Sequence, residues 1–124
     1  MTIRNFRELR VWRVGMEVLV AVYELTRKLP REEMYGLTSQ LRRAAVSVPS
    51  NISEGFNRRR VGEYVQHLHY ALGSCAELDT QIEACKLLEY VTEEEAEEVI
   101  EQLTGESKML RRLSATLEKQ TRSR

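Results

Sequence analysis

The sequence predicts an all-α protein: an up-and-down antiparallel four-helix bundle built from one domain, residues 1–124. Apolar residues recur at steps of three and four along nearly the whole chain, which is the period of helices buried on one face. Two prolines and six glycines are too few for the frequent turns of an all-β protein, and 124 residues suit one domain. We expect helices at about residues 6–29, 35–57, 60–89 and 92–118, joined by short loops and followed by a polar tail, 119–124.

The first predicted helix carries two apolar stripes instead of one. One consists of Leu9, Trp12, Met16, Leu19 and Tyr23, and the other of Val11, Val14, Val18, Val22, Leu25 and Leu29. The stripes lie about 140° apart, so that either the helix is central in its own domain or its second face meets another subunit. Because a small bundle has few layers, we expect an oligomer interface formed by Val11, Val14, Val18, Val22 and Leu25. Pro30 ends this helix.

The second predicted helix begins near Tyr35 and contains a proline. Its apolar stripe keeps the helical phase across Pro49 and consists of Leu37, Leu41, Ala44, Ala45, Val48, Ile52 and Phe56. A proline inside a helix costs about 3 kcal/mol and bends it, so we expect one kinked helix. Gly55 and Asn57 then permit a turn, which carries three consecutive arginines.

The third and fourth helices have clear apolar seams. The third seam consists of Tyr64, Leu68, Ala71, Cys75, Leu78, Ile82 and Cys85. Small residues at 73–76 would allow another backbone to approach closely, and we place Gly73 in the predicted oligomer interface. Thr92 and Glu95 form a capping box that starts the fourth helix, whose stripe consists of Ala96, Val99, Leu103, Leu110, Leu113 and Leu117.

The chain has no net charge, but its charges are segregated along the sequence. Residues 1–62 carry twelve Lys and Arg against six acids, residues 63–101 carry eleven acids against one Lys, and residues 102–124 carry six Lys and Arg against two acids. Blocks of one sign often mark interaction surfaces, although solvated helix faces also carry charge without a partner.

The arginine clusters are the candidate nucleic-acid-binding residues: Arg42, Arg43, Arg58, Arg59, Arg60, Arg111 and Arg112. Arginine binds phosphate with two parallel hydrogen bonds, and few aromatic residues are free to stack on bases. Binding through these residues would therefore address the phosphate backbone, depend on salt and show little sequence specificity. For Arg42 and Arg43 an equal alternative is an ion pair with Glu54, Glu77 or Asp79.

The sequence contains no recognisable catalytic or metal-binding motif. A glycine-rich phosphate loop, a nucleophile elbow and an HExxH motif are all absent. His67 and His69 point to different helix faces, and Cys75 and Cys85 are too far apart on one helix to form a disulfide with each other. We expect no enzymatic activity, no metal and no cofactor.

Composition also bears on the compartment. No apolar run approaches the roughly 18–20 residues that span a bilayer, and no signal peptide is evident. Two cysteines make no disulfide framework. We therefore expect a cytoplasmic protein that does not associate with membranes.

Several motifs resemble a known family. The segments are residues 6–9, 11–12 and 23–26, then the most specific block, residues 36–55 (GLTSQLRRAAVSVPSNISEG), then 63–64, Leu68, 71–74 and 77–81. Together they resemble the bacterial four-helix-bundle proteins first noticed in intervening sequences of large-subunit ribosomal RNA genes. The resemblance runs from about Phe6 to Leu117.

That family is similar in fold to the accessory variability determinant of diversity-generating retroelements. The resemblance implies a homopentameric barrel that binds structured RNA or DNA, with a reverse transcriptase as a further partner. The expected function is thus a non-enzymatic nucleic-acid-binding accessory protein. The alternative is a protein–protein scaffold that uses the acidic face of residues 63–101 and binds no nucleic acid.

Overall fold

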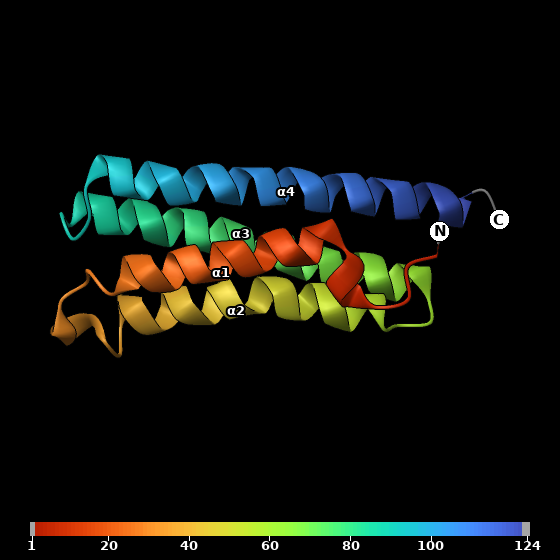
Figure 1. The fold of residues 1–124 in the computed structure, drawn as a ribbon, viewed down its shortest axis with the longest axis horizontal. Coiled ribbons are helices and arrows are strands. Elements are labelled where there is room, and N and C mark those ends of the chain that lie inside the picture. Colours follow the sequence, from red (N-terminus) through yellow and green to blue (C-terminus); the bar gives the residue numbers. More distant parts are fainter. Residues whose placement is uncertain (1, 123–124) are drawn as a thin grey trace.

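The computed structural model describes residues 2–122, with side chains through residue 120, and they form four long helices. The elements are η1 (Phe6–Glu8), α1 (Arg10–Thr26), η2 (Arg31–Glu33), α2 (Leu37–Phe56), α3 (Val61–Leu87) and α4 (Glu93–Arg122). The long helices run alternately up and down, and each packs on two neighbours: α1 on α2 and α4, and α3 on α2 and α4 (Figure 1). No strand occurs among the described residues, so the predicted all-helical fold is confirmed.

The first predicted helix is divided in two. Asn5 starts the short η1 turn, since its side chain accepts from the amide of Arg7 at 2.9 Å and the Glu8 carboxylate accepts from the amide of Asn5 at 2.9 Å. Leu9 is then extended before α1 begins. This local capping competes with a continuous helix, and α1 ends at Thr26, before the predicted Leu29.

The chain differs from expectation at the end of α4, whereas α2 is continuous as predicted. α4 continues through residues 119–122, where a frayed tail was expected, and residues 123–124 lie outside the described part of the chain. α2 is one helix across Pro49, which is buried inside it. The kink at Pro49 stays a prediction.

The placement of α1 corrects the predicted oligomer interface. Val18 and Val22 are completely buried in the core of their own bundle, and Val11 and Leu25 are also buried. The stripe that contains Val18 is therefore used within one chain, whereas Trp12 and Leu19 of the other stripe are only half-buried. The assignment of Val11, Val18, Val22 and Leu25 to a subunit interface was wrong, and the assignment of the half-buried Val14 stays a prediction.

α2 and α3 approach each other closely at Gly55. A Cβ atom on Gly55 would lie 2.8 Å from Cβ of His67 and 3.2 Å from the carbonyl oxygen of Tyr64, so no larger side chain fits there without movement. Further along the same interface, Ser74 donates to Oγ of Ser47 at 2.8 Å. Small residues thus set the spacing of these two helices.

A carboxylic acid lies in the apolar core. Glu106 of α4 is completely buried, and neither carboxyl oxygen has a hydrogen-bond partner among the described residues. Gly15 of α1 makes room for it, since a Cβ there would lie 2.8 Å from Oε2 of Glu106. Burial, reinforced by the charge of Glu17, raises the pKa of Glu106 to about 8. The group is therefore mostly protonated at neutral pH.

Other features of the core agree with the sequence. Cys75 and Cys85 are buried free thiols, and burial raises the pKa of each to about 11. None of the described helices has the length and apolar character needed to cross a membrane.

We predict that Gly55→Ala lowers the free energy of unfolding by about 1–3 kcal/mol, because the added methyl group overpacks the α2–α3 contact. The matched control is Gly73→Ala, since a Cβ on Gly73 would meet open space. That change should be neutral or stabilise the helix by up to about 1 kcal/mol. Urea unfolding followed by circular dichroism measures both, and equal effects would contradict the packing argument.

We predict that the stability of the protein falls as the pH rises from about 4.5 to 8. The unfolded carboxyl of Glu106 ionises near pH 4.5, whereas the native carboxyl keeps its proton until a pKa of about 8, so the native state binds more protons across this interval. Relative to Glu106→Gln, the wild type should lose about 3–5 kcal/mol of unfolding free energy over this interval. Urea titrations of both proteins at several pH values measure this, and parallel pH profiles would contradict it.

Candidate nucleic-acid interface

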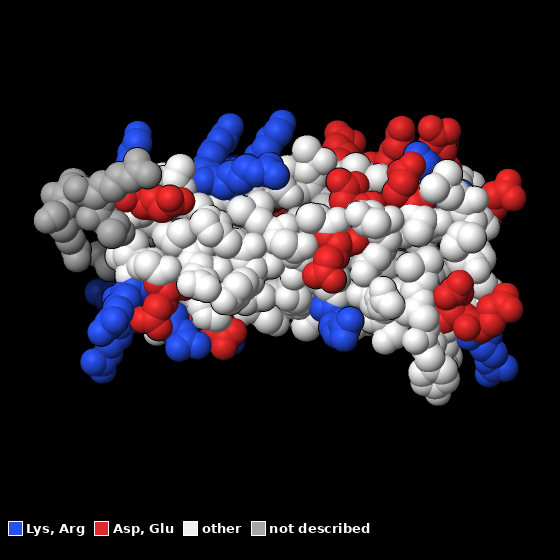
Figure 2. Space-filling model, turned by 180° about the vertical axis from the view of Figure 1, so that it is seen from behind, with Lys and Arg blue, Asp and Glu red and all other residues white. Residues whose placement is uncertain are grey.

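The antiparallel arrangement turns charge blocks of the sequence into charged regions of the molecule. The α2–α3 loop lies at the same end of the bundle as the end of α4, whereas the α1–α2 and α3–α4 connections lie at the opposite end (Figure 1). Lys and Arg side chains project from α4 toward the first end, and Asp and Glu gather over the other half of that helix (Figure 2). The bundle is therefore electrically polar along its length.

The loop between α2 and α3 presents three exposed arginines. Arg58 forms ion pairs with Glu54 at 3.5 Å and with Glu63 at 3.9 Å, which offset part of its charge. Arg59 and Arg60 are exposed, and among the described residues neither side chain forms an ion pair. The two consecutive guanidinium groups are available to an external anion.

A second basic group lies on the outer surface of α4. Lys108, Arg111 and Arg112 are exposed and belong to the C-terminal half of α4, which runs toward the α2–α3 loop. Arg112 is ten residues from the end of α4, or about 15 Å at 1.5 Å per residue. The structure therefore places Arg59, Arg60, Arg111 and Arg112 in the same half of the bundle.

Arg42 and Arg43 lie apart from that basic half. Nε of Arg42 donates to the hydroxyl of Thr26 at 2.9 Å, and its guanidinium lies 4.8 Å from the ring centre of Tyr23. Arg42 thus links α2 to α1, and its assignment to nucleic-acid binding stays a prediction. The predicted ion-pair alternative is not the contact formed, because the partners are a hydroxyl group and an aromatic ring. Arg43 is exposed, sixteen residues from Arg59, or about 24 Å along the chain in helical geometry.

The opposite end of the bundle is acidic, and several of its carboxylates form hydrogen bonds or ion pairs. Glu95 forms the predicted capping box with Thr92, through bonds of 2.8 and 3.1 Å, and also pairs with Lys28. These contacts hold the pKa of Glu95 below its usual value, with the Lys28 hydrogen bond as the largest cause. Glu33 accepts from the hydroxyl of Tyr90 and from a backbone amide, which lower its pKa as well. This end carries charge that repels phosphate.

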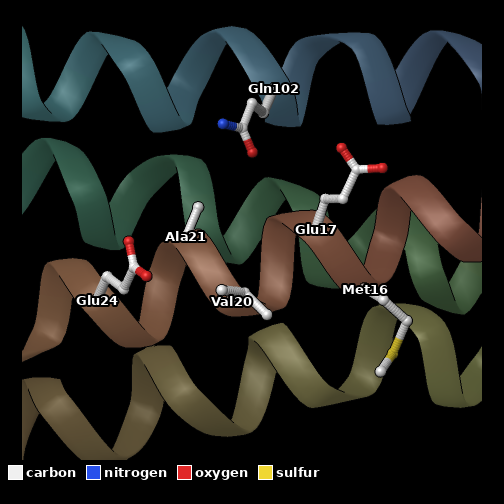
Figure 3. Close-up of a pocket in the computed structure, with 6 residues that line it drawn as sticks. All are labelled: Met16, Glu17, Val20, Ala21, Glu24 and Gln102. Carbon is white, nitrogen blue, oxygen red and sulfur yellow. The ribbon is translucent and has the colours of Figure 1, made fainter.

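Two exposed valines were missed in the sequence. Val20 of α1 is 53% exposed and Val46 of α2 is 40% exposed. Val46 lies against a mostly apolar hollow of about 360 Å³ between α1 and α2, together with Trp12, Leu19 and Pro49. Val20 and Met16 line a separate hollow of about 400 Å³ together with Ala21 and Gln102 (Figure 3). The sequence did contain a signal for their exposure, because neither valine belongs to an apolar stripe of its helix.

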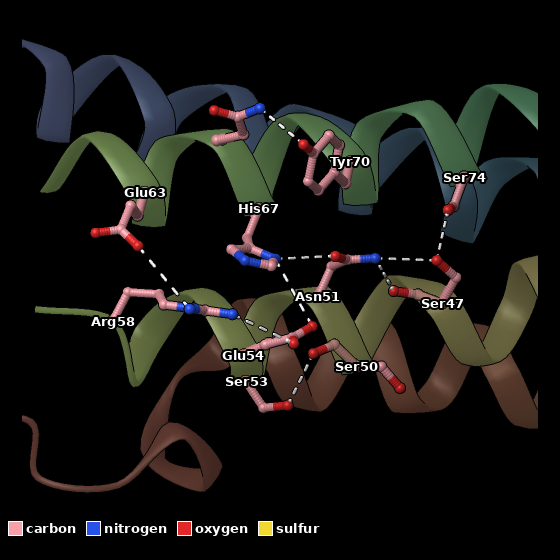
Figure 4. A network of polar contacts seen from close by, with 11 residues as sticks. Ser47, Ser50, Asn51, Ser53, Glu54, Arg58, Glu63, His67, Tyr70 and Ser74 are labelled. Atoms are coloured by element: carbon pink, nitrogen blue, oxygen red, sulfur yellow. Dashed lines mark hydrogen bonds and ion pairs between the residues drawn. The ribbon is translucent and has the colours of Figure 1, made fainter. Parts of the chain in front are cut away.

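A polar network joins α2 to α3 near the basic end (Figure 4). The amide of Asn51 donates to the backbone and hydroxyl oxygens of Ser47, and Nδ1 of His67 lies 3.1 Å from the Asn51 amide oxygen. Since that oxygen can only accept, Nδ1 of His67 must donate. Among the described residues, the side chain of His67 has polar contacts with Asn51 and, at 3.8 Å, with Glu54, and it forms no hydrogen bond with a serine hydroxyl. Its visible role is to fix the α2–α3 contact.

Metal ligands do not cluster in the described part of the chain. No group of three His, Cys, Asp or Glu side chains is arranged there to hold a metal ion. His69 is directed to Glu118 at 3.9 Å, on a different side of α3 from His67. The strongest arrangement for binding a ligand is thus the basic half of the bundle.

Comparisons with known proteins support the resemblance seen in the sequence. In a solved crystal structure, a protein of unknown function from the S23 ribosomal protein family of Bacteroides thetaiotaomicron has a similar fold, with a TM-score of 0.78 and 24% identity over 84% of this chain and 97% of that one. No curated protein matches the chain. The model of the 23S rRNA-intervening sequence protein family matches residues 7–112. Since this match spans most of the sequence, the chain belongs to the 23S rRNA-intervening sequence protein family.

Proposed function

We propose that the protein is a non-enzymatic, cytoplasmic accessory protein that binds structured RNA or DNA through backbone phosphates. The observation that carries the proposal is the pair Arg59 and Arg60, exposed and without ion pairs among the described residues, in the same half of the bundle as Arg111 and Arg112. Guanidinium groups bind phosphate in a bidentate manner and stay charged at any physiological pH. The likeness to the accessory variability determinant extends the proposal to a reverse transcriptase as a protein partner.

The charge distribution limits how nucleic acid would lie. Glu93, Glu94, Glu97 and Glu98 are exposed at the acidic end of α4 and repel phosphate. A nucleic acid would therefore contact the basic half alone. Few phosphates would be neutralised by one chain, so the affinity of a single bundle would be modest and dependent on salt.

We further propose that the chain assembles as a homopentamer, which would repeat the basic surface. The burial of Val18 directs the search for an interface to the outer apolar surface of α1 and α2, where Trp12, Leu19 and Val46 border the hollow of about 360 Å³. A five-membered ring requires two different complementary patches on each subunit. Several linked basic surfaces would raise the apparent affinity for a long nucleic acid without any new type of contact.

We predict that Arg59→Ala combined with Arg60→Ala weakens binding to structured RNA by about tenfold or more at moderate salt. The slope of log affinity against log salt should fall by about 1.4–1.8, since each lost phosphate contact removes about 0.7–0.9. Arg27 and Arg43, both exposed and outside the basic half, provide the matched control. Their double alanine variant should bind within about twofold of wild type.

Fluorescence anisotropy with a labelled RNA hairpin across a salt series measures these affinities. Equal losses in the two double variants would show that binding follows total charge and would contradict the assignment of the site. Absence of wild-type binding even at low salt would contradict nucleic-acid binding itself.

We predict that Val46→Glu abolishes assembly while the helix content stays unchanged, because the side chain is 40% exposed on the proposed interface. Val18→Asp should instead unfold the bundle, because Val18 is completely buried. Light scattering measures the mass and circular dichroism measures the melting temperature. A monomeric wild type at micromolar concentration would contradict the proposed pentamer.

A further inference from the structure

A groove runs along the seam between α1 and α4. Two hollows of about 400 and 340 Å³ share Ala21, Glu24 and Gln102 and so form one continuous depression. It extends from Met16 to Lys28 on α1, twelve residues or about 18 Å, which is the length of three helical turns. Its position is separate from the basic half of α4 and from the α2–α3 loop.

Small and polar side chains open this seam. Ala21 and Glu17 of α1 point toward α4, and Gln102 of α4 points toward α1 (Figure 3). Ala21 is too short to fill the space below Gln102, and its neighbours along the groove include the apolar residues Leu25 and Val99. The groove therefore combines apolar residues with polar ones along its lining.

The edges of the groove are acidic on both sides. Glu17 and Glu24 belong to α1, and Glu95 and Glu98 belong to α4. Lys28 is the one basic side chain that lines the groove, and it pairs with Glu95. Within the described residues, the carboxylates of Glu17, Glu24 and Glu98 form no ion pair. Three uncompensated negative charges thus border the apolar residues of the groove.

We propose that this groove binds a short amphipathic α-helix of a partner protein, with small apolar residues on one face and Lys or Arg on either side of that face. Packing an apolar helix face into a groove between two helices is a common mode of peptide recognition, and the acidic edges select a cationic partner. The same charges exclude RNA and DNA. The inference concerns a surface outside the proposed nucleic-acid interface and does not depend on it.

A synthetic peptide tests the proposal. The probe is a fluorescein-labelled helix of about fifteen residues, with Leu and Ala at helical spacing on one face and Lys on both flanks. Its comparator is a scrambled peptide of the same composition, which has the same charge and no apolar face. The wild-type protein should bind the helical peptide at least about tenfold more tightly than the scrambled one.

Charge reversal provides the matched protein variants. Glu24→Lys with Glu98→Lys changes two groove residues, whereas Glu77→Lys with Glu97→Lys makes the same change in net charge at exposed positions of α3 and α4 that do not line the groove. The groove variant should bind the helical peptide at least about tenfold more weakly, and the control should stay within about threefold of wild type. Ala21→Phe, which fills the groove without a change of charge, should also weaken binding.

Circular dichroism melting verifies that each variant is folded. Three results would overturn the proposal. The wild type could fail to bind the helical peptide, it could bind the scrambled peptide equally well, or the control variant could lose as much affinity as the groove variant. Light scattering adds one more decisive outcome. If the wild type binds no peptide and the groove variant dissociates an oligomer of the wild type, a second copy of the chain occupies the groove and the proposal is wrong.

Discussion

The close approach of α2 and α3 at Gly55 is the constraint on which the basic end of the molecule depends. A Cβ there would overlap His67, so the spacing of the two helices is fixed by the absence of a side chain. At that spacing Asn51 reaches His67, and Ser74 reaches Ser47. The chain must then reverse direction within a few residues, which places Arg59 and Arg60 at the tip of the bundle. Exposure of these arginines thus follows from the packing of small residues.

The contact between α1 and α4, on the other side of the bundle from the α2–α3 contact, leaves open space at the surface. α4 contributes Glu106 to the core, where a carboxyl without a hydrogen-bond partner is costly even when protonated. Gly15 accommodates that carboxyl, and the short side chain of Ala21 keeps the groove beside Gln102 open. The contact between α1 and α4 therefore contains a buried carboxyl without a hydrogen-bond partner as well as an open groove. A partner helix in the groove would cover apolar surface that the chain leaves exposed.

The sequence predicted the fold because helical periodicity is a local property that the bundle preserves. It predicted the capping box of Thr92 and Glu95 for the same reason. Periodicity shows which residues share a face but not what covers that face, so the stripe containing Val18 was placed between subunits instead of in the core. Glu106 was missed because the apolar stripe of the last helix steps directly from Leu103 to Leu110. That gap of seven residues was the available signal for a polar core position.

The charge segregation explains how one chain without net charge can offer surfaces of opposite sign. Along α4, Glu98 and Arg112 are fourteen residues apart, or about 21 Å. The screening length at physiological ionic strength is about 8 Å, so the field of each group has largely decayed before it reaches the other. The basic end and the acidic groove therefore act as independent surfaces. If both proposals hold, an anionic polymer and a cationic helix would bind at separate places on the bundle and would not displace each other.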